Sequence, residues 1–179
     1  MTDITLNSDN DEFVPRRPKT GDELLSTSGV VVVSDILGFI ASERRHRQEK
    51  ADQAADVIRR IGPYRWVGIY DVDEEDAVVI AWSGLGPPAF VRFPNTAGLT
   101  GQAVRTKQTV VANDVANNPH YLTAFAGTRA EIIVPVLDKS GSRVVGTIDV
   151  ESDKLNAFGA PDQRVLEDCA LALAPLWQE

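Results

Sequence analysis

Three acidic side chains lie in a segment that otherwise has the pattern of a buried hairpin. The segment, residues 131–152, reads EIIVPVLDKSGSRVVGTIDVES, and the acids near its two ends are Glu131, Asp149 and Glu151. Side chains two apart on a strand point to the same face of a sheet, so Asp149 and Glu151 stand side by side. The same alternation places Val145 on their face. Carboxylates that converge can hold an ammonium or guanidinium group through charge-assisted hydrogen bonds.

The position of the third acid depends on how the two strands are paired. If Leu137 pairs with Arg143 around the turn, Glu131 faces Asp149, whereas a one-residue slip would turn Glu131 to the opposite face of the sheet. A solvated strand end is the alternative to a binding site, because Lys139 and Arg143 offer ordinary cross-strand partners.

Two aromatic residues and two glycines could complete such a site. Trp66 and Tyr70 lie four apart on one strand face, where they either enclose a ligand or belong to the core. Gly98 and Gly101 open an expected helix and either direct free amides at an anion or form a plain helix-entry turn. Acids for an amine and amides for a carboxylate would together recognise a zwitterion, such as an amino acid.

The charge of the chain opposes binding to nucleic acid. The sequence of 179 residues has 18 Lys and Arg against 26 Asp and Glu, a formal net charge of −8. Its one strong basic cluster, ERRHRQEK at residues 43–50, is interleaved with acids in the manner of a solvated helix face. We therefore expect no nucleic-acid partner.

The few sulfur and imidazole groups restrict the chemistry. Cys169 is the single cysteine, and His46 and His120 are the only histidines, so an intramolecular disulfide and a Cys/His zinc site are excluded. The sequence has no P-loop and no nucleophile-elbow motif. We expect no metal and no cofactor.

The hydropathy pattern contains no candidate membrane helix. The longest apolar run, residues 29–41, contains Ser34 and Asp35 and is shorter than the ~20 residues that a membrane-spanning helix requires. The start of the chain lacks the basic n-region and the small-residue cleavage pattern of a signal peptide. A cytoplasmic location, with no membrane partner, is the expectation.

The first third of the chain is expected to hold a tail and a helix. Residues 1–28 are polar and are expected to form a flexible tail, and residues 29–179 a single domain. Apolar positions in the first part of residues 29–60 recur eighteen residues later, which is five helical turns. This spacing predicts one long helix, or two in line, with a polar middle at residues 43–48.

The remaining pattern predicts an α+β fold. Strand-like runs at residues 65–72, 77–82 and 89–93 are typical of an antiparallel meander. A short helix from residue 98, a brief strand within residues 109–114, the hairpin and a final amphipathic helix from Pro161 follow. We expect an antiparallel sheet of five or six strands with the N- and C-terminal helices on one face and a ligand pocket on the other.

Several of these motifs together resemble a known family. WVGIY, FVRFPNTAGLTGQAV, TVVANDV, EIIVPV and GTIDVES followed by Phe158 are similar in order and spacing to GAF domains, most closely to free methionine-(R)-sulfoxide reductases. The resemblance covers residues 61–177 and implies a GAF-like fold. It also implies a substrate pocket lined by five residues of this chain: Trp66, Tyr70, Glu131, Asp149 and Glu151.

The chain departs from that family at its catalytic thiols. The family's cysteines would lie at Phe90, Thr100 and Ala124, and none of these holds sulfur. Thiol-based sulfoxide reduction needs a thiolate that attacks sulfur and a second thiol that resolves the product. Cys169 falls on an apolar helix stripe and has no such partner. The resemblance also implies an aspartate where this chain has Glu151.

The expected function is that of a GAF-type sensor or regulatory module for a small polar or amino-acid-like ligand. The ligand-binding positions are Trp66, Tyr70, Phe90, Thr100, Glu131, Asp149 and Glu151, with no catalytic residue. The alternatives are a reductase-like enzyme that has lost its thiols and a structural dimerisation module. A homodimer through the terminal helices and a separate output protein are the expected protein partners.

Overall fold

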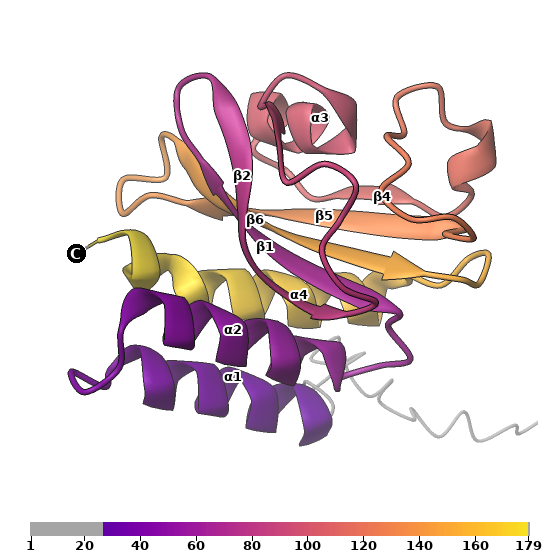
Figure 1. The fold of residues 1–179 in the computed structure, drawn as a ribbon. Coiled ribbons are helices and arrows are strands. Elements are labelled where there is room, and N and C mark those ends of the chain that lie inside the picture. The colour runs from indigo at the N-terminus through magenta and orange to yellow at the C-terminus, as the bar shows by residue number, and fades with distance from the viewer. Residues whose placement is uncertain (1–26, 179) are drawn as a thin grey trace, which may run out of the picture.

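The computed structural model describes residues 27–178 of the chain (Figure 1). The elements are α1 Thr27–Ile40, α2 Arg47–Arg59, β1 Trp66–Val72, β2 Asp76–Gly84, β3 Arg92–Pro94, α3 Gly98–Thr106, β4 Val110–Ala112, η1 Val115–Asn117, β5 Ala130–Leu137, β6 Val144–Ser152, α4 Ala160–Leu173 and η2 Ala174–Trp177. The tail expected over residues 1–28 lies outside the described residues, apart from Thr27 and Ser28, which begin α1.

The strands form one six-stranded sheet in the order β3-β2-β1-β6-β5-β4, and every neighbouring pair is antiparallel. The predicted meander of the first three strands is confirmed, although β3 begins later than the pattern indicated. The two strands that carry the acidic residues, β5 and β6, lie toward the middle of the sheet. Because β6 pairs with both β1 and β5, it brings the aromatic strand and the acidic hairpin together.

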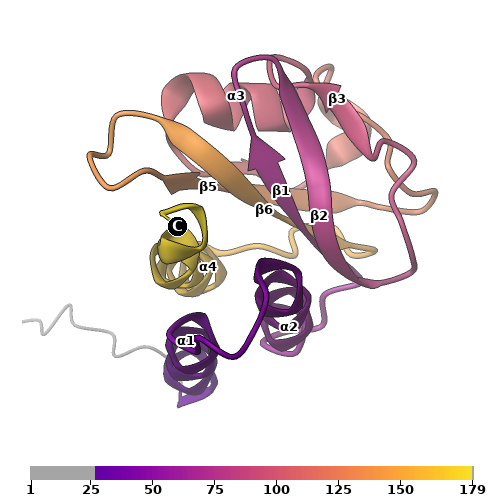
Figure 2. The same ribbon diagram turned by 60° about the vertical axis from the view of Figure 1, so that its left-hand side comes forward.

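The helices form two further layers on one face of the sheet. Helices α2 and α4 pack directly on the strands, and α1 packs on the outer side of both (Figure 2). Helix α3 lies on the opposite face (Figure 1). The predicted α+β fold, with the terminal helices on one face, is therefore confirmed.

The prediction of one long helix, or two in line, before β1 is wrong. The chain leaves the helical conformation at residues 41–46, and α2 folds back beside α1 (Figures 1 and 2). At the start of α2, the Glu49 carboxylate accepts a hydrogen bond of 3.3 Å from the His46 amide, which caps the new helix. Because α2 folds back, the apolar faces of α1 and α2 both reach the same core. Ile36 on α1 and Ile58 on α2 are each fully buried there. In a single straight helix, one stripe would extend beyond the sheet.

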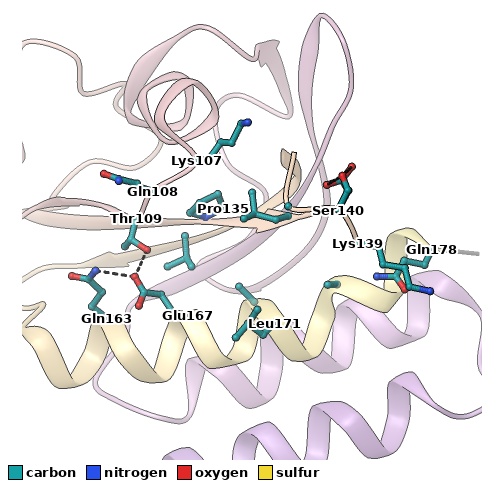
Figure 3. Close-up of a pocket in the computed structure, with 16 residues that line it drawn as sticks. Lys107, Gln108, Thr109, Pro135, Lys139, Ser140, Gln163, Glu167, Leu171 and Gln178 are labelled. Carbon is teal, nitrogen blue, oxygen red and sulfur yellow. Dashed lines mark hydrogen bonds between the residues drawn. The ribbon is translucent and has the colours of Figure 1, made fainter. Parts of the chain in front are cut away.

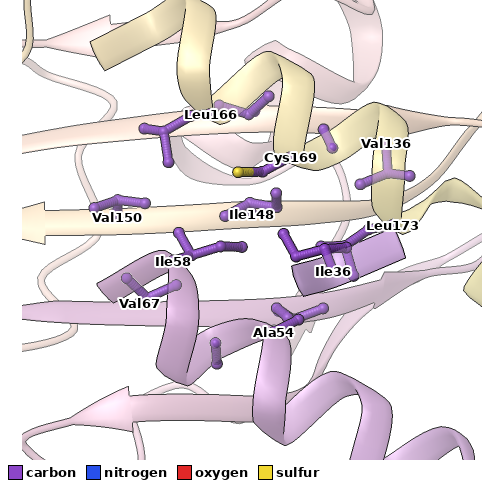
Figure 4. Packing of buried hydrophobic residues seen from close by; sticks show 14 of the residues in the cluster. Ile36, Ala54, Ile58, Val67, Val136, Ile148, Val150, Leu166, Cys169 and Leu173 are labelled. Atoms are coloured by element: carbon purple, nitrogen blue, oxygen red, sulfur yellow. The ribbon is translucent and has the colours of Figure 1, made fainter. Parts of the chain in front are cut away.

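The main core lies between the sheet and the helices (Figure 4). Ile148 and Val67 project from the strands toward Leu166 and Cys169 on α4 and Ile58 on α2. Cys169 is fully buried, and its burial raises the pKa of the thiol to about 12. The expectation that Cys169 is a buried apolar residue is confirmed.

The hairpin of β5 and β6 has a different register from the expected one. Leu137 pairs with Val144, and an irregularity next to it shifts the remaining pairs so that Glu131 faces Glu151 rather than Asp149. The shift is two residues, so Glu131 still shares a face with the other acids. The irregularity also turns Val145 into the helix-side core, contrary to the simple alternation. A β-bulge next to the turn has this effect on side-chain direction.

Candidate functional site

A small pocket lies on the face of the sheet that carries α3. The space inside it is about 30 Å³, which is about the volume of one water molecule. All seven predicted ligand-binding residues line it, and five further residues complete its wall. The twelve residues are Trp66, Tyr70, Phe90, Phe93, Gly98, Leu99, Thr100, Leu122, Ala124, Glu131, Asp149 and Glu151.

Strand pairing brings the three carboxyl groups together. Glu131 on β5 lies opposite Glu151 on β6, and Asp149 lies two residues before Glu151 on the same face. The exposed fractions are 7% for Glu131, 4% for Asp149 and 1% for Glu151. The acids are therefore part of a buried site, and the alternative of a solvated strand end is excluded.

Asp149 is held by two hydroxyl groups. Thr147 Oγ1 donates a hydrogen bond of 2.6 Å to Asp149 Oδ1, and Thr100 Oγ1 lies 3.4 Å from Oδ2 as a weaker donor. Burial raises the pKa of Asp149 to about 7, with a further rise from the charge of Glu151, while the two hydroxyls lower it. Near neutral pH the protonated and the ionised forms of Asp149 are therefore both populated.

Glu151 has one oxygen bound and one oxygen without a partner. The Thr128 hydroxyl donates to Oε2, whereas Oε1 is buried and has no hydrogen-bond partner. Burial raises the pKa of Glu151 to about 6, although the Thr128 hydroxyl and the Arg65 charge lower it. An ionised buried oxygen without a donor costs free energy, which a ligand donor would recover.

Glu131 also favours its protonated form. Its pKa is raised well above the usual value, first by burial and then by the charges of Asp149 and Glu151. Burial is the larger cause of this rise in pKa, and mutual repulsion among the three acids is the smaller one. A bound cation would reverse both effects because it stabilises the ionised carboxylates.

Trp66 and Tyr70 belong both to the wall of the pocket and to a buried aromatic cluster. The two ring centroids are 6.5 Å apart, and Trp66 also lies 5.2 Å from Phe125. The indole Nε1 donates a hydrogen bond of 2.9 Å to the Gly86 carbonyl oxygen. Gly68 leaves room for the indole, because a Cβ atom there would lie 2.1 Å from the ring. The interpretation of the two rings as core residues is thus confirmed, and the same rings also line the pocket.

The entry to α3 lies beside the acids. Gly98 lines the pocket and has a φ of +67°, a conformation that favours glycine. The Gly101 amide, however, donates to the Ala97 carbonyl oxygen at 2.8 Å. A Cβ atom on Gly101 would lie 2.2 Å from the backbone of Thr96. Gly101 is therefore required for a close helix entry, and its amide is not available to a ligand.

The three positions at which the resembled reductases carry cysteine all line the pocket. Thr100 bonds Asp149, Phe90 is 42% exposed at the rim, and Ala124 completes the wall. The amide of Ala89 donates to the Ala124 carbonyl oxygen at 3.3 Å, which joins the loops that carry these residues.

The sequence did not identify three residues that the loop between η1 and β5 supplies. Leu122 lines the pocket, Thr128 bonds Glu151, and Tyr121 packs beside β4 and β5. All three lie in a polar segment without strand or helix periodicity, so the pattern gave no signal for them. Thr147 was detectable, because it lies two residues before Asp149 on the same strand.

A larger hollow lies elsewhere, between β5, its turn to β6, and α4 (Figure 3). Its volume is about 840 Å³. Both acidic groups on its wall already have partners. Glu167 accepts hydrogen bonds from Thr109 at 2.6 Å and Gln163 at 2.8 Å (Figure 3), and Asp138 accepts hydrogen bonds from the Ser142 amide at 2.8 Å and the Ser140 hydroxyl at 3.0 Å. Among the residues that line this hollow, no set of charged groups converges as the acids do in the small pocket.

The described part of the chain contains neither a metal-binding cluster nor a membrane-spanning helix. Within residues 27–178, no group of His, Cys, Asp or Glu side chains is arranged to hold a metal ion. No helix in that range combines the length and the apolar character needed to cross a bilayer.

An antiparallel six-stranded sheet with helices on one face and an enclosed pocket on the other defines an α+β domain of the GAF type. A family model described as "GAF domain" matches residues 45–175, and the chain belongs to this family. The family resemblance proposed from the motifs is therefore confirmed.

The individual relatives are of two kinds, proteins named for the GAF domain and reductases. The chain is 31% identical over 135 residues to GAF domain-containing protein A of Dictyostelium discoideum, covering 75% of this chain and 83% of the relative. It is similar to the structure of a type II free methionine-R-sulfoxide reductase from Thermoplasma acidophilum, with 31% identity, a TM-score of 0.69, and coverage of 79% and 94%. The free methionine-R-sulfoxide reductase of Neisseria meningitidis in complex with its substrate gives 26% identity, a TM-score of 0.75, and coverage of 86% and 92%.

Proposed function

We propose that this protein is a GAF-type binding module, in a sensor or regulatory role, whose ligand is a small amine-bearing molecule such as an amino acid. The observation that carries the proposal is the convergence of Glu131, Asp149 and Glu151 in one buried pocket. A ligand ammonium group would replace their mutual repulsion by charge-assisted hydrogen bonds. The resemblance to enzymes named for free methionine-R-sulfoxide agrees with a ligand of this class.

The proposal excludes reductase chemistry through a thiolate in the pocket. That chemistry requires a thiolate that can reach the substrate sulfur and a second thiol that resolves the product. The sequence contains one cysteine, Cys169, which is buried in the core on the helix side of the sheet. Its pKa of about 12 keeps the thiol protonated at neutral pH.

The pocket is small, so side chains in its wall must move when a ligand enters. The space of about 30 Å³ is too small for an amino acid. Leu122 and Phe90 stand in the wall and are partly exposed, so their displacement opens the pocket without disturbing the main core. The carboxyl groups on β5 and β6 would stay in place, because these strands lie inside the sheet.

Thermal unfolding at pH 8 in the presence of a compound panel tests the proposal. The panel contains free amino acids, both epimers of methionine sulfoxide, small amines, and the matching carboxylic acids without the amine. A ligand that binds only the folded state adds ~2.7 kcal/mol of stability at about 100 times its Kd. For a chain of this length, we expect an upward shift of the unfolding midpoint by roughly 5–10 °C with the best amine.

Two variants that each remove one negative charge distinguish binding in the pocket from a general effect of charge. Asp149→Asn should abolish most of the shift, because it removes an acid that faces the ligand. Asp138→Asn lies on the exposed hairpin turn and should leave the shift intact. A panel in which no amine stabilises the wild type, or an equal shift in Asp149→Asn, would refute the proposed function.

A further inference from the structure

The small pocket is charged at its buried end and apolar where it opens to solvent. Its charged side chains, Glu131, Asp149 and Glu151, are all buried. The residues of its wall that are half-buried or exposed form its mouth, and none has a polar side-chain atom: Phe90, Phe93, Gly98, Leu122 and Ala124. A molecule that enters the pocket therefore meets carboxyl groups at its inner end and apolar groups at its outer end.

Two large side chains are the most exposed residues of the mouth. Phe90 is 42% exposed and Leu122 is 36% exposed, and they come from different loops. The Ala89 amide donates a hydrogen bond of 3.3 Å to the Ala124 carbonyl oxygen, which joins the two loops. Single exposed apolar residues are common, whereas apolar side chains gathered around a pocket are typical of a binding surface.

The apolar surface continues from the pocket onto β2. Trp82, which is 41% exposed, is the cross-strand partner of Gly68 on β1. Directly opposite residues of an antiparallel pair share a face of the sheet. The Trp66 indole lies across Gly68, because a Cβ atom there would be 2.1 Å from the ring, and the same indole lines the pocket. Trp82 therefore lies on the pocket face, next to the wall that Trp66 forms.

We propose that Phe90 and Leu122 form a subsite for an apolar group, and that the ligand class is an amine that carries an apolar chain or ring. The inference rests on the proposed function, since the ammonium group of the same ligand is held by the acids. Contact with the two side chains removes apolar surface from water, whereas a hydroxyl at the mouth would lose water without gaining a side-chain partner. The resembled reductases carry cysteine at residue 90, so the phenyl ring at the mouth distinguishes this chain from them.

Calorimetric titration at pH 8 with straight-chain amines, from ethylamine to hexylamine, tests the subsite. The affinity of the wild-type protein should rise about two- to fourfold for each CH₂ group that reaches the mouth. The compound 5-amino-1-pentanol has the length of hexylamine with a hydroxyl in place of the terminal methyl group. It should bind about tenfold more weakly than hexylamine, because its hydroxyl is desolvated against apolar side chains.

Variants of the two mouth residues assign the effect to the subsite. Phe90→Ala and Leu122→Ala should each weaken hexylamine binding about fivefold and leave ethylamine, which is too short to reach the mouth, nearly unchanged. Phe90→Leu keeps an apolar side chain and should retain most of the dependence on chain length. Leu155→Ala is the matched control, because Leu155 is 40% exposed and does not line the pocket, and it should behave as wild type.

The binding outcomes separate the subsite from the function on which it rests. If the amines bind the wild type with an affinity that does not depend on chain length, the apolar subsite is refuted and the amine site stands. The same conclusion follows if Leu155→Ala weakens hexylamine binding as much as Phe90→Ala does. If no amine of any length binds the wild type, the proposed function and the subsite fall together.

Discussion

Asp149→Asn should make the free protein more stable at pH 8, with a gain over wild type that disappears toward pH 4. The reason is the pKa of Asp149, which rises from 3.8 to about 7 on folding. A carboxyl group with a raised folded-state pKa contributes its full stability below its unfolded pKa, and this contribution is lost as the pH rises through the folded pKa. Each pKa unit corresponds to about 1.4 kcal/mol. The stability difference between the variant and wild type should therefore grow by about 4 kcal/mol between pH 4 and pH 8.

Urea unfolding of both proteins at a series of pH values measures this difference. Asp138→Asn is a control with the opposite sign, because the hydrogen bonds at the hairpin turn lower the pKa of Asp138. That variant should lose stability at pH 8 and should be close to wild type at acid pH. A flat difference between Asp149→Asn and wild type from pH 4 to pH 8 would mean that Asp149 is solvated in the folded protein.

Gly68→Ala should strongly destabilise the protein and displace the indole that forms one wall of the pocket. The added Cβ atom would lie 2.1 Å from the Trp66 ring. Trp66 is only 1% exposed and has the buried ring of Tyr70 and the half-buried ring of Phe125 beside it. Overpacking of a buried site typically costs about 1–3 kcal/mol. We expect a loss near the upper end, about 3 kcal/mol, because the strand on which Gly68 lies is paired on both edges.

Gly38→Ala is the matched control for that substitution. Gly38 lies within α1, and a Cβ atom there would meet nothing within 4 Å. Alanine should therefore add about 1 kcal/mol through its better helix propensity. Urea unfolding followed by tryptophan fluorescence reports both variants, and Gly68→Ala should also change the emission of the folded state. A Gly68→Ala protein with wild-type stability and emission would show that the indole does not lie across the glycine.

Most of the fold could be predicted because its elements have clear periodicity. The strands around Trp66, Val79 and Ile148 alternate or are uniformly apolar, and the stripe through Leu166 and Leu173 has the helical period. The relation of α1 to α2 could not be predicted, because two helices in phase give the same eighteen-residue spacing whether they run on or fold back. Only the tertiary core distinguishes these cases.

The site could be predicted in part for a similar reason. Period-two alternation placed Asp149 and Glu151 on one face, and the two-residue error in register did not change the face of Glu131. The bulge that turns Val145 inward has no sequence signal of its own. Tyr121 and Thr128 come from an irregular loop, where side-chain direction follows from contacts rather than from spacing.

The raised pKa values link the stability of the protein to its proposed function. Free protein at neutral pH holds carboxyl groups that resist ionisation, whereas an amine ligand requires them ionised. Ligand binding should therefore release protons from the pocket, and affinity should rise as the pH increases from 6 to 8, where aliphatic amines stay protonated.

The most direct test of this account is the titration of Asp149 and Glu151 by carboxyl-carbon NMR, without ligand and with the most stabilising amine of the panel. The account predicts free-protein midpoints near the pKa values of about 7 and about 6, and a fall of at least about one unit for Asp149 when the amine is bound. An Asp149 that titrates near its usual 3.8 in the free protein, or whose midpoint does not move when the amine is added, would contradict it.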